Sequence, residues 1–103
     1  MRQFDILDNP SIRSRAVAPY VVVLQSHHLA AIPTTIIAPL FTGDRKSAYS
    51  EINVIVEHGG QELILSVSEM VAVDIRELSS PNGNLIIYED EIRRAMDRLF
   101  TGF

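Results

Sequence analysis

Two runs of alternating apolar residues, separated by a pair of glycines, constrain the fold of this chain more than any other feature. Every second residue before and after Gly59-Gly60 is leucine or β-branched: Ile52, Val54, Val56, Leu63, Leu65 and Val67. A period of two places all of these side chains on one face of a strand pair. A Gly-Gly step provides the positive φ angles of a tight primed turn. Residues 51–68 are therefore predicted to form a β-hairpin.

Further strands are predicted on both sides of this hairpin. Alternation and β-branched runs indicate strands at 3–7, 20–25, 34–40, 71–75 and, as a short addition, 85–87. Turn-forming residues indicate loops at 8–16, 26–33, 42–47 and 78–84. The run at 20–25 has no polar face, so we expect it to be buried on both sides. Pro39 has no N–H group, so the strand that contains it should bend there or lie at a sheet edge.

The segment Tyr88–Phe103 is predicted to form an amphipathic helix. Apolar residues recur at helical spacing, at positions 92, 95, 96, 99, 100 and 103. Three acids open the segment and three arginines follow, which suits the helix dipole, and Asp90 is placed to pair with Arg94. Gly102 is suited to the left-handed residue that ends a helix. We expect Phe100 to pack beneath the helix, whereas Thr101 and Phe103 have little structural role.

These elements predict a mainly β protein with one helix. Strands joined by short turns favour a mostly antiparallel sheet or small barrel, with the apolar stripe of the C-terminal helix packed on it. The 103 residues suit a single domain spanning 1–103.

Composition limits the kinds of partner. The chain has no cysteine, a net charge of −4 and no apolar run long enough to cross a bilayer. Its first residues lack the basic-then-apolar pattern of a signal peptide. A net negative charge disfavours direct sequence-specific binding of nucleic acid, which needs a basic patch. We therefore expect a cytoplasmic protein, not associated with a membrane, whose partners are proteins.

No convincing catalytic or metal-binding set is present. His27 and His28 are adjacent, so on a strand they would point to opposite faces, and His58 is the only other histidine. The acids at 89–91 are explained by the helix dipole. Arg13 and Arg15 could stabilise a phosphoryl transition state, but an exposed loop explains them better. We expect no catalytic residues, no metal and no cofactor.

Several ordered segments resemble the CcdB family, the toxins of type II toxin–antitoxin modules. They are Gln3-Phe4, Val23-Leu24-Gln25-Ser26, residues 35–40, Met70-Val71-Ala72-Val73 and the closing segment 91–103. The resemblance covers nearly the whole chain. The closing segment departs from the family pattern at Thr101, where the family has tryptophan, and at Asp97, where it has an amide residue. Phe103 replaces a terminal isoleucine.

The resemblance implies an SH3-like barrel of the type shared by CcdB and MazF toxins, acting as a homodimer without catalytic activity. Members bind the A subunit of DNA gyrase and trap the gyrase–cleaved DNA complex, and a CcdA-type antitoxin neutralises them. The implied gyrase-binding residues are Phe100, Thr101, Gly102 and Phe103 in the tail, with Gln3, Phe4 and Ser26 beside them. Tryptophan is a strong interface anchor, so Thr101 implies a weaker or altered gyrase contact. The alternatives are a MazF-like endoribonuclease and a non-toxic SH3-like binding module.

Overall fold

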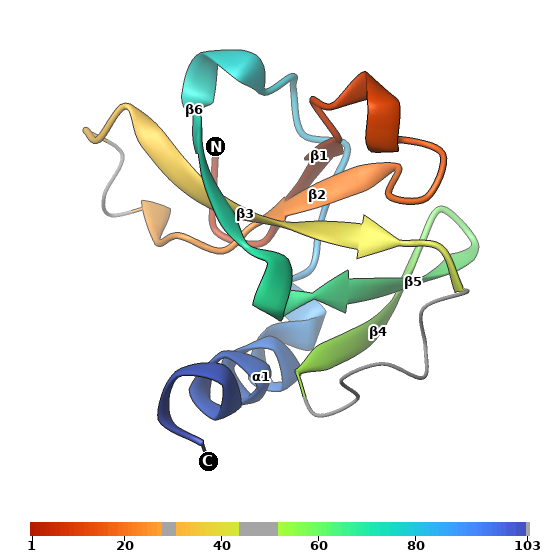
Figure 1. The fold of residues 1–103 in the computed structure, drawn as a ribbon, viewed down its shortest axis with the longest axis vertical. Helices are drawn as coiled ribbons and strands as arrows, with labels where there is room; N and C mark the ends of the chain where they lie inside the picture. The colour runs from red at the N-terminus through yellow and green to blue at the C-terminus, as the bar shows by residue number, and fades with distance from the viewer. Residues whose placement is uncertain (28–30, 44–51, 103) are drawn as a thin grey trace.

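A curled antiparallel sheet forms most of the molecule (Figure 1). This computed structural model describes residues 1–27, 31–43 and 52–102. The sheet order is β4-β5-β3-β2-β1-β7, and β6 pairs with β3. The strands are β1 (Asp5–Asp8), β2 (Tyr20–Val23), β3 (Thr34–Phe41), β4 (Asn53–His58), β5 (Gln61–Ser66), β6 (Val71–Asp74) and β7 (Gly83–Asn84). The mainly β half-barrel with one C-terminal helix confirms the predicted fold class.

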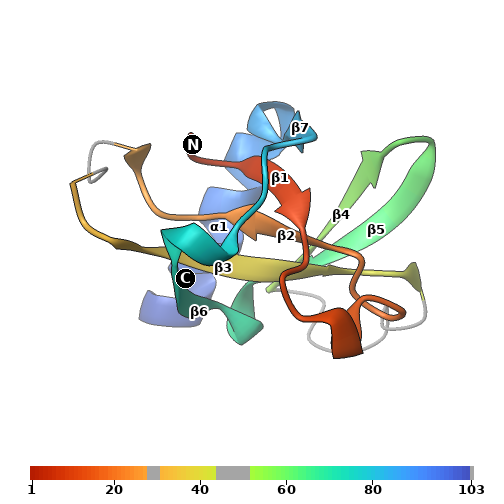
Figure 2. The same ribbon diagram turned by 90° about the horizontal axis from the view of Figure 1, so that it is seen from above.

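The central strand β3 changes partners along its length, which explains the position of Pro39. Its first half pairs with β6 from Thr34 to Ile37, and its end pairs with β5 at Leu40 and Phe41. Pro39 lies between these two ladders while it pairs with Val21 on the opposite side. A residue without an N–H therefore costs no ladder bond here. Figure 2 shows β3 crossing the molecule while the β4–β5 hairpin diverges from it.

The predicted hairpin is confirmed from Asn53 to Ser66, whereas Val67 and Ser68, predicted to extend it, lie in a 3-10 turn, Val67–Glu69. The ladder runs from Asn53↔Ser66 to His58↔Gln61, and the two turn glycines have φ angles of 61° and 75°. Val56 and Leu63 are almost completely buried on the predicted face. Glu51, at the start of the predicted hairpin, and positions 44–47 of the predicted 42–47 loop lie outside the described residues.

Apolar side chains pack on both faces of the sheet. One cluster includes Phe4, Val22, Leu40 and Ile92, and the other comprises Leu7, Val21, Val23 and Ile37. Because β2 contributes to both clusters, the prediction that its continuous apolar run is buried on two sides is confirmed.

Short helical turns replace strand in several places. Residues 85–87 do not form the predicted strand, since β7 ends at Asn84 and a 3-10 turn spans Ile86–Tyr88. Ile75 is likewise not part of β6 but begins a 3-10 turn, Ile75–Glu77. Asp74 starts that turn by accepting the Arg76 N–H through its side chain, and this local hydrogen bond competes with continued strand.

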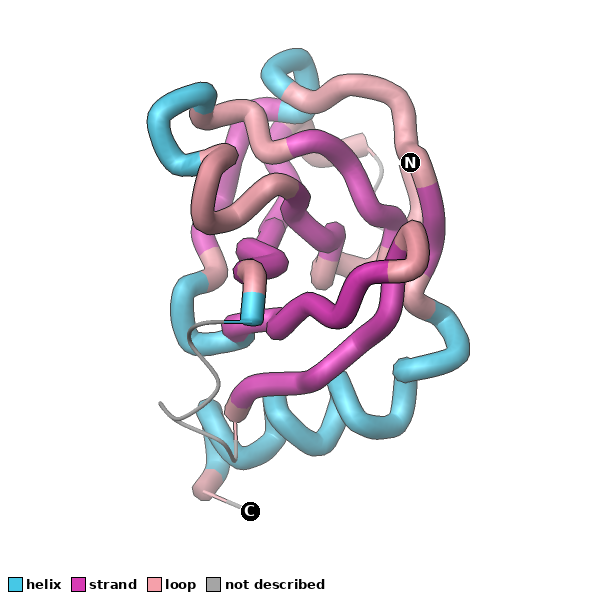
Figure 3. Tube along the Cα trace, turned by 90° about the vertical axis from the view of Figure 1, so that its right-hand side faces the viewer, coloured by secondary structure: helices cyan, strands magenta, loops and turns pink. Residues whose placement is uncertain are grey.

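Helix α1 (Glu89–Thr101) lies along one side of the sheet (Figure 3). Ile92 and Ala95 are buried, and Met96 and Leu99 are partly buried against the same core, so the predicted stripe holds at these four positions. Phe100 is 69% exposed, and the prediction that it packs beneath the helix is wrong. The predicted Asp90–Arg94 pair is replaced by Glu89–Arg93, at 2.7 Å, while Arg94 bonds the backbone carbonyl of Asp90. No helix in the described part of the chain is long and apolar enough to cross a membrane.

The two ends of the sheet meet through side chains. His58 Nε2 lies 3.1 Å from Asn82 Oδ1, and the Glu57 N–H donates to the Tyr88 hydroxyl at 3.0 Å. The His58 ring also packs against Gly83 and makes an edge contact with Tyr20 at 4.9 Å. We call this contact between the end of β4 and residues 82–88 the seam. It closes the half-barrel without a backbone ladder.

Candidate functional site

A strained turn at the N-terminus forms the base of the candidate site. The Asp5 N–H donates to the Arg2 carbonyl at 3.1 Å, and the Arg2 N–H donates to the Asp5 carboxylate at 2.7 Å. Phe4, inside this turn, has a φ of 72°. A non-glycine residue in this region costs roughly 1–3 kcal/mol, and such strain concentrates at functional sites. Burial of the Phe4 ring, which is 1% exposed, holds the turn in place.

A cavity of ≈ 660 Å³ opens beside this turn. It is lined by Arg2, Gln3, Phe4, Asp5, Ser26, His27, Asn84, Ile86, Glu89 and Arg93. The fold therefore brings Gln3 and Phe4 together with Ser26, which lies more than twenty positions later in the chain.

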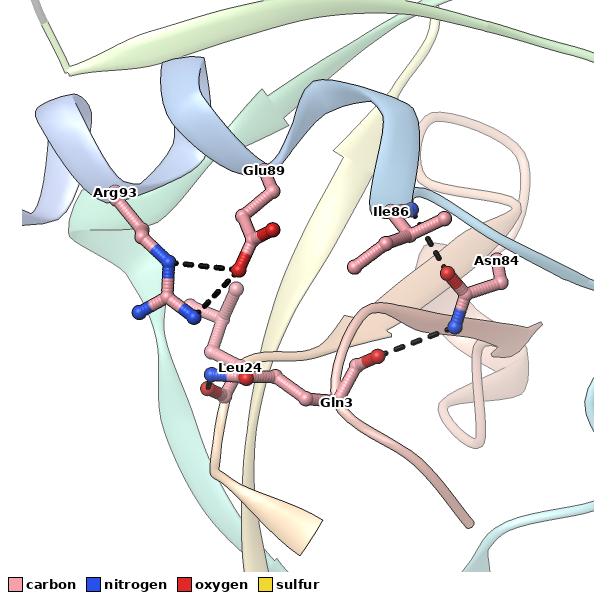
Figure 4. Close-up of polar contacts among 6 residues, drawn as sticks. All are labelled: Gln3, Leu24, Asn84, Ile86, Glu89 and Arg93. Carbon is pink, nitrogen blue, oxygen red and sulfur yellow. Dashed lines mark hydrogen bonds and ion pairs between the residues drawn. The ribbon is translucent and has the colours of Figure 1, made fainter.

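Asn84 ties three elements of the cavity together (Figure 4). Its Nδ2 donates to the Gln3 carbonyl at 3.1 Å and to the Asp5 carboxylate at 2.9 Å. Its Oδ1 accepts the Ile86 N–H at 2.8 Å, at the start of the turn that leads into α1. Asn84 thus fixes the N-terminal turn relative to the helix.

The helix wall of the cavity is charged. Both Nε and Nη2 of Arg93 donate to one carboxylate oxygen of Glu89, at 2.9 and 2.7 Å (Figure 4). The guanidinium also lies 5.8 Å from the centroid of the Phe4 ring, within range of a cation–π interaction. On the opposite wall, the Gln3 amide donates to the Leu24 carbonyl at 3.0 Å. The cavity therefore has a fixed, mixed-charge rim.

The face of α1 that carries Arg93 continues to Phe100. Seven residues rotate a helix by about 700°, which leaves the two residues about 20° apart, and separate them by about 10.5 Å along the axis. The exposed Phe100 ring and the cavity therefore belong to one surface. Thr101 follows, with its hydroxyl donating to the Asp97 carbonyl at 2.6 Å.

Gly102 ends the helix as predicted. Its φ is 80°, and its N–H donates to the Arg98 carbonyl at 3.0 Å. Phe103 lies outside the described residues. The site residues from the sequence therefore fall into two groups: Gln3, Phe4 and Ser26 at the cavity, and Phe100, Thr101 and Gly102 at the helix end.

Sequence reasoning missed the cavity residues Asn84, Glu89 and Arg93. Glu89 and Arg93 carried a signal, because opposite charges four positions apart on a helix can pair. Asn84 carried none, because its role depends on chain segments that meet only in the folded protein.

The described residues hold no group of three or more histidine, cysteine or acidic side chains placed to bind a metal. His58 lies in the seam and His27 is exposed at the cavity, while His28 is outside the described residues. Arg13 and Arg15 are both exposed, as expected of loop residues, and Arg15 donates to the Asn9 carbonyl at 2.6 Å.

Comparison with known proteins agrees with this geometry. A family model described as CcdB protein matches residues 3–102. No curated protein sequence matches the chain. The family match covers all of α1 and, apart from Arg2, the N-terminal turn and the cavity lining. The chain therefore belongs to the CcdB family, the toxins of toxin–antitoxin modules.

Proposed function

We propose that this protein is a type II toxin that binds the A subunit of DNA gyrase and traps the gyrase–cleaved DNA complex. It acts in the cytoplasm by binding, without catalysing a reaction of its own. The observation that carries the proposal is the exposed Phe100 ring, which lies on the same helix face as the N-terminal cavity. Aromatic residues that are exposed in the free protein and become buried on association are common anchors of protein interfaces.

The candidate residues have different roles in this proposal. Phe100 is the anchor, Gly102 ends the helix beside it, and Phe103 is a further proposed gyrase contact. Thr101 lies on the outer face of the helix, where a residue smaller than tryptophan provides less contact area. Gln3 and Ser26 provide polar contacts at the cavity. Phe4 is buried, so it acts by holding the N-terminal turn rather than by touching the partner.

A homodimer and an antitoxin complete the proposal. Val71 on β6 is 53% exposed, and no strand in the described ranges pairs with the outer edge of β6. An exposed apolar strand edge of this kind suits association with a second copy through a two-fold interface. The dimer would present two tails to the gyrase dimer, and a CcdA-type antitoxin would neutralise it.

Phe100→Ala provides the sharpest test. Loss of a strong anchor residue lowers the binding free energy by about 2 kcal/mol or more. The affinity for gyrase A should therefore fall roughly thirty-fold. Ile12→Ala is the matched control, because Ile12 is also strongly exposed, at 79%, but lies in the β1–β2 connection. Both variants should keep the parent melting temperature. Equal gyrase binding by Phe100→Ala and the parent protein would contradict the proposal.

Deletion of residues 101–103 extends the test to toxicity. The truncated protein should fold and bind antitoxin. It should no longer trap the cleaved-DNA complex of purified gyrase, and it should no longer arrest growth. Growth arrest by the truncated protein would reject the tail mechanism.

The same preparation separates the alternatives. Cleavage of RNA without any effect on gyrase would identify an endoribonuclease. Growth arrest in a gyrase-sensitive host and not in a gyrase-resistant host is the result that the proposal requires. Absence of arrest in both hosts would indicate a non-toxic binding module.

A further inference from the structure

A second groove lies between strand β4 and helix α1. Its volume is ≈ 420 Å³, and its walls are Asn53, Val54, Ile55, Tyr88, Glu91, Arg94, Ala95 and Arg98. It shares no residue with the cavity at the N-terminal turn. Arg94 is rotated about 100° around the helix from Arg93, so the groove and the Arg93–Phe100 face are different surfaces of α1.

The strand wall of the groove offers backbone groups for pairing. β4 is the last strand in the sheet order, and no strand in the described part of the chain pairs with its outer edge. The Glu57 N–H points to this edge, because it donates to the Tyr88 hydroxyl. In an antiparallel pair, every second residue directs its N–H and C=O groups away from the partner strand. Ile55 therefore directs its backbone groups outward as well, and its side chain is 55% exposed.

The helix wall of the groove is mainly basic. Arg94 and Arg98 are one helical turn apart, whereas Glu91 is the only acid among the lining residues. This local positive charge contrasts with the net charge of −4 of the whole chain.

The spacing of the two arginines matches that of an extended chain. Four helical residues rise about 6 Å, and alternate residues of a β-strand are about 6.6–6.8 Å apart. Two acidic side chains at positions i and i+2 of a strand could thus face both guanidinium groups. Arginine–carboxylate pairs of this kind are among the stronger hydrogen bonds in proteins.

We propose that this groove binds an extended acidic segment of a partner protein. The segment adds to the outer edge of β4 through the Ile55 backbone, and its alternate carboxylates pair with Arg94 and Arg98. Addition of a strand to an open sheet edge is a common mode of peptide recognition. The groove shares no lining residue with the cavity at the N-terminal turn, so its test does not depend on the gyrase proposal.

The test uses the full chain and a blocked octapeptide of alternating glutamate and threonine. Titration of the ¹⁵N-labelled protein should shift the backbone resonances of residues 53–57 and 91–98 in an NMR spectrum. A matched peptide with lysine in place of glutamate should not bind. Absence of binding by the glutamate peptide, or shifts confined to other regions, would overturn the proposal.

Three substitutions then separate strand addition from general charge attraction. Arg94→Glu and Arg98→Glu should each weaken the glutamate peptide about tenfold or more. Arg13→Glu makes the same change of charge at an exposed loop position and should have little effect. Equal weakening by all three variants would show non-specific attraction and reject the site.

Ile55→Pro tests the backbone contact. Proline removes an N–H that β5 does not use, so the hairpin should remain while peptide binding falls about tenfold. If a folded Ile55→Pro protein binds the peptide as tightly as the parent, strand addition is wrong. If this variant does not fold, the arginine variants and the resonance map decide the question.

Discussion

Gly83→Ala tests the seam that closes the half-barrel. A Cβ atom at Gly83 would lie 2.8 Å from His58 Cε1, 3.2 Å from His58 Nδ1 and 3.2 Å from Ile6 Cδ1. Contacts under 3.0 Å do not persist, so the imidazole must move. The backbone at Gly83 does not have a positive φ, so any cost arises from the neighbouring side chains rather than from the backbone.

The expected cost follows from the contacts that His58 would lose. Its hydrogen bond to Asn82 is worth about 0.5–1.5 kcal/mol. Its edge contact with the Tyr20 ring is worth about another 0.5–1.5 kcal/mol. The alanine itself raises the free energy of unfolding by about 0.4–1 kcal/mol, because it lowers the conformational entropy of the unfolded chain. The net loss in the free energy of unfolding should therefore be about 1.3 kcal/mol, and at most about 2.6 kcal/mol.

A double-mutant cycle isolates this effect. Urea unfolding of Gly83→Ala, His58→Ala and the double variant should show that Gly83→Ala destabilises the protein less once the imidazole is absent, by about 1 kcal/mol or more. The contact of the added Cβ with Ile6 Cδ1 at 3.2 Å sets the cost that remains. Thermal unfolding provides a second measurement, since 1 kcal/mol shifts the melting temperature of a domain of this size by about 4–8 °C.

One outcome would refute the reasoning about the seam. If Gly83→Ala costs the same free energy with and without His58, then the imidazole is not what excludes a side chain at position 83. The closure of the half-barrel would then have to rest on other contacts.

Three further substitutions test other parts of the structure. Ile92→Ala should lower the free energy of unfolding in urea by about 2–5 kcal/mol, because Ile92 is fully buried. Phe100→Ala should change it by less than about 0.5 kcal/mol, and a similar loss for both variants would contradict the exposure of Phe100. Gly102→Ala should destabilise the end of α1 by about 1–2 kcal/mol, because an alanine is strained at the positive φ of this position even though a Cβ would meet no other atom. Faster amide exchange in the last helical turn would show this loss of stability. Hydrogen bonds from Arg76 hold the pKa of Asp74 below its usual range. The Asp74–Arg76 pair therefore stabilises the folded protein at pH values above the pKa of the unfolded state, and this stabilisation is lost as pH falls through the lower folded pKa. Titration of the Asp74 carboxyl by NMR should show that Arg76→Gln raises its pKa. An unchanged pKa would show that the hydrogen bonds from Arg76 are not what lowers it.

Patterns of local periodicity predicted most of the strands correctly. The hairpin around Gly59 and Gly60 and the two-sided burial of β2 follow from residue spacing alone. Residues 85–87 were predicted wrongly, because a short apolar run does not distinguish a strand from a helical turn. Here Asn84 decides the outcome, since its side chain captures the Ile86 N–H and starts the turn.

The candidate site was less predictable from residue patterns. The family resemblance indicated Gln3, Phe4 and Ser26, and the fold does place them around one cavity. The positive φ of Phe4 had no sequence signal, because phenylalanine normally avoids that conformation. It is held by core packing of the ring and by hydrogen bonds on both sides of the residue, which exist only in the folded protein.

Helix α1 separates what the sequence determined from what the tertiary structure decided. Helical periodicity, the acidic first turn and Gly102 determined that a helix forms and where it ends, because these effects act within a few residues. Periodicity also grouped Phe100 with the buried stripe. Tertiary packing left its ring exposed, because the side of α1 that faces the core carries Ile92, Ala95 and the partly buried Leu99, whereas Phe100 lies on the side of Arg93. Which apolar residues are buried depends on which side of the helix faces the sheet, and no local pattern contains that orientation.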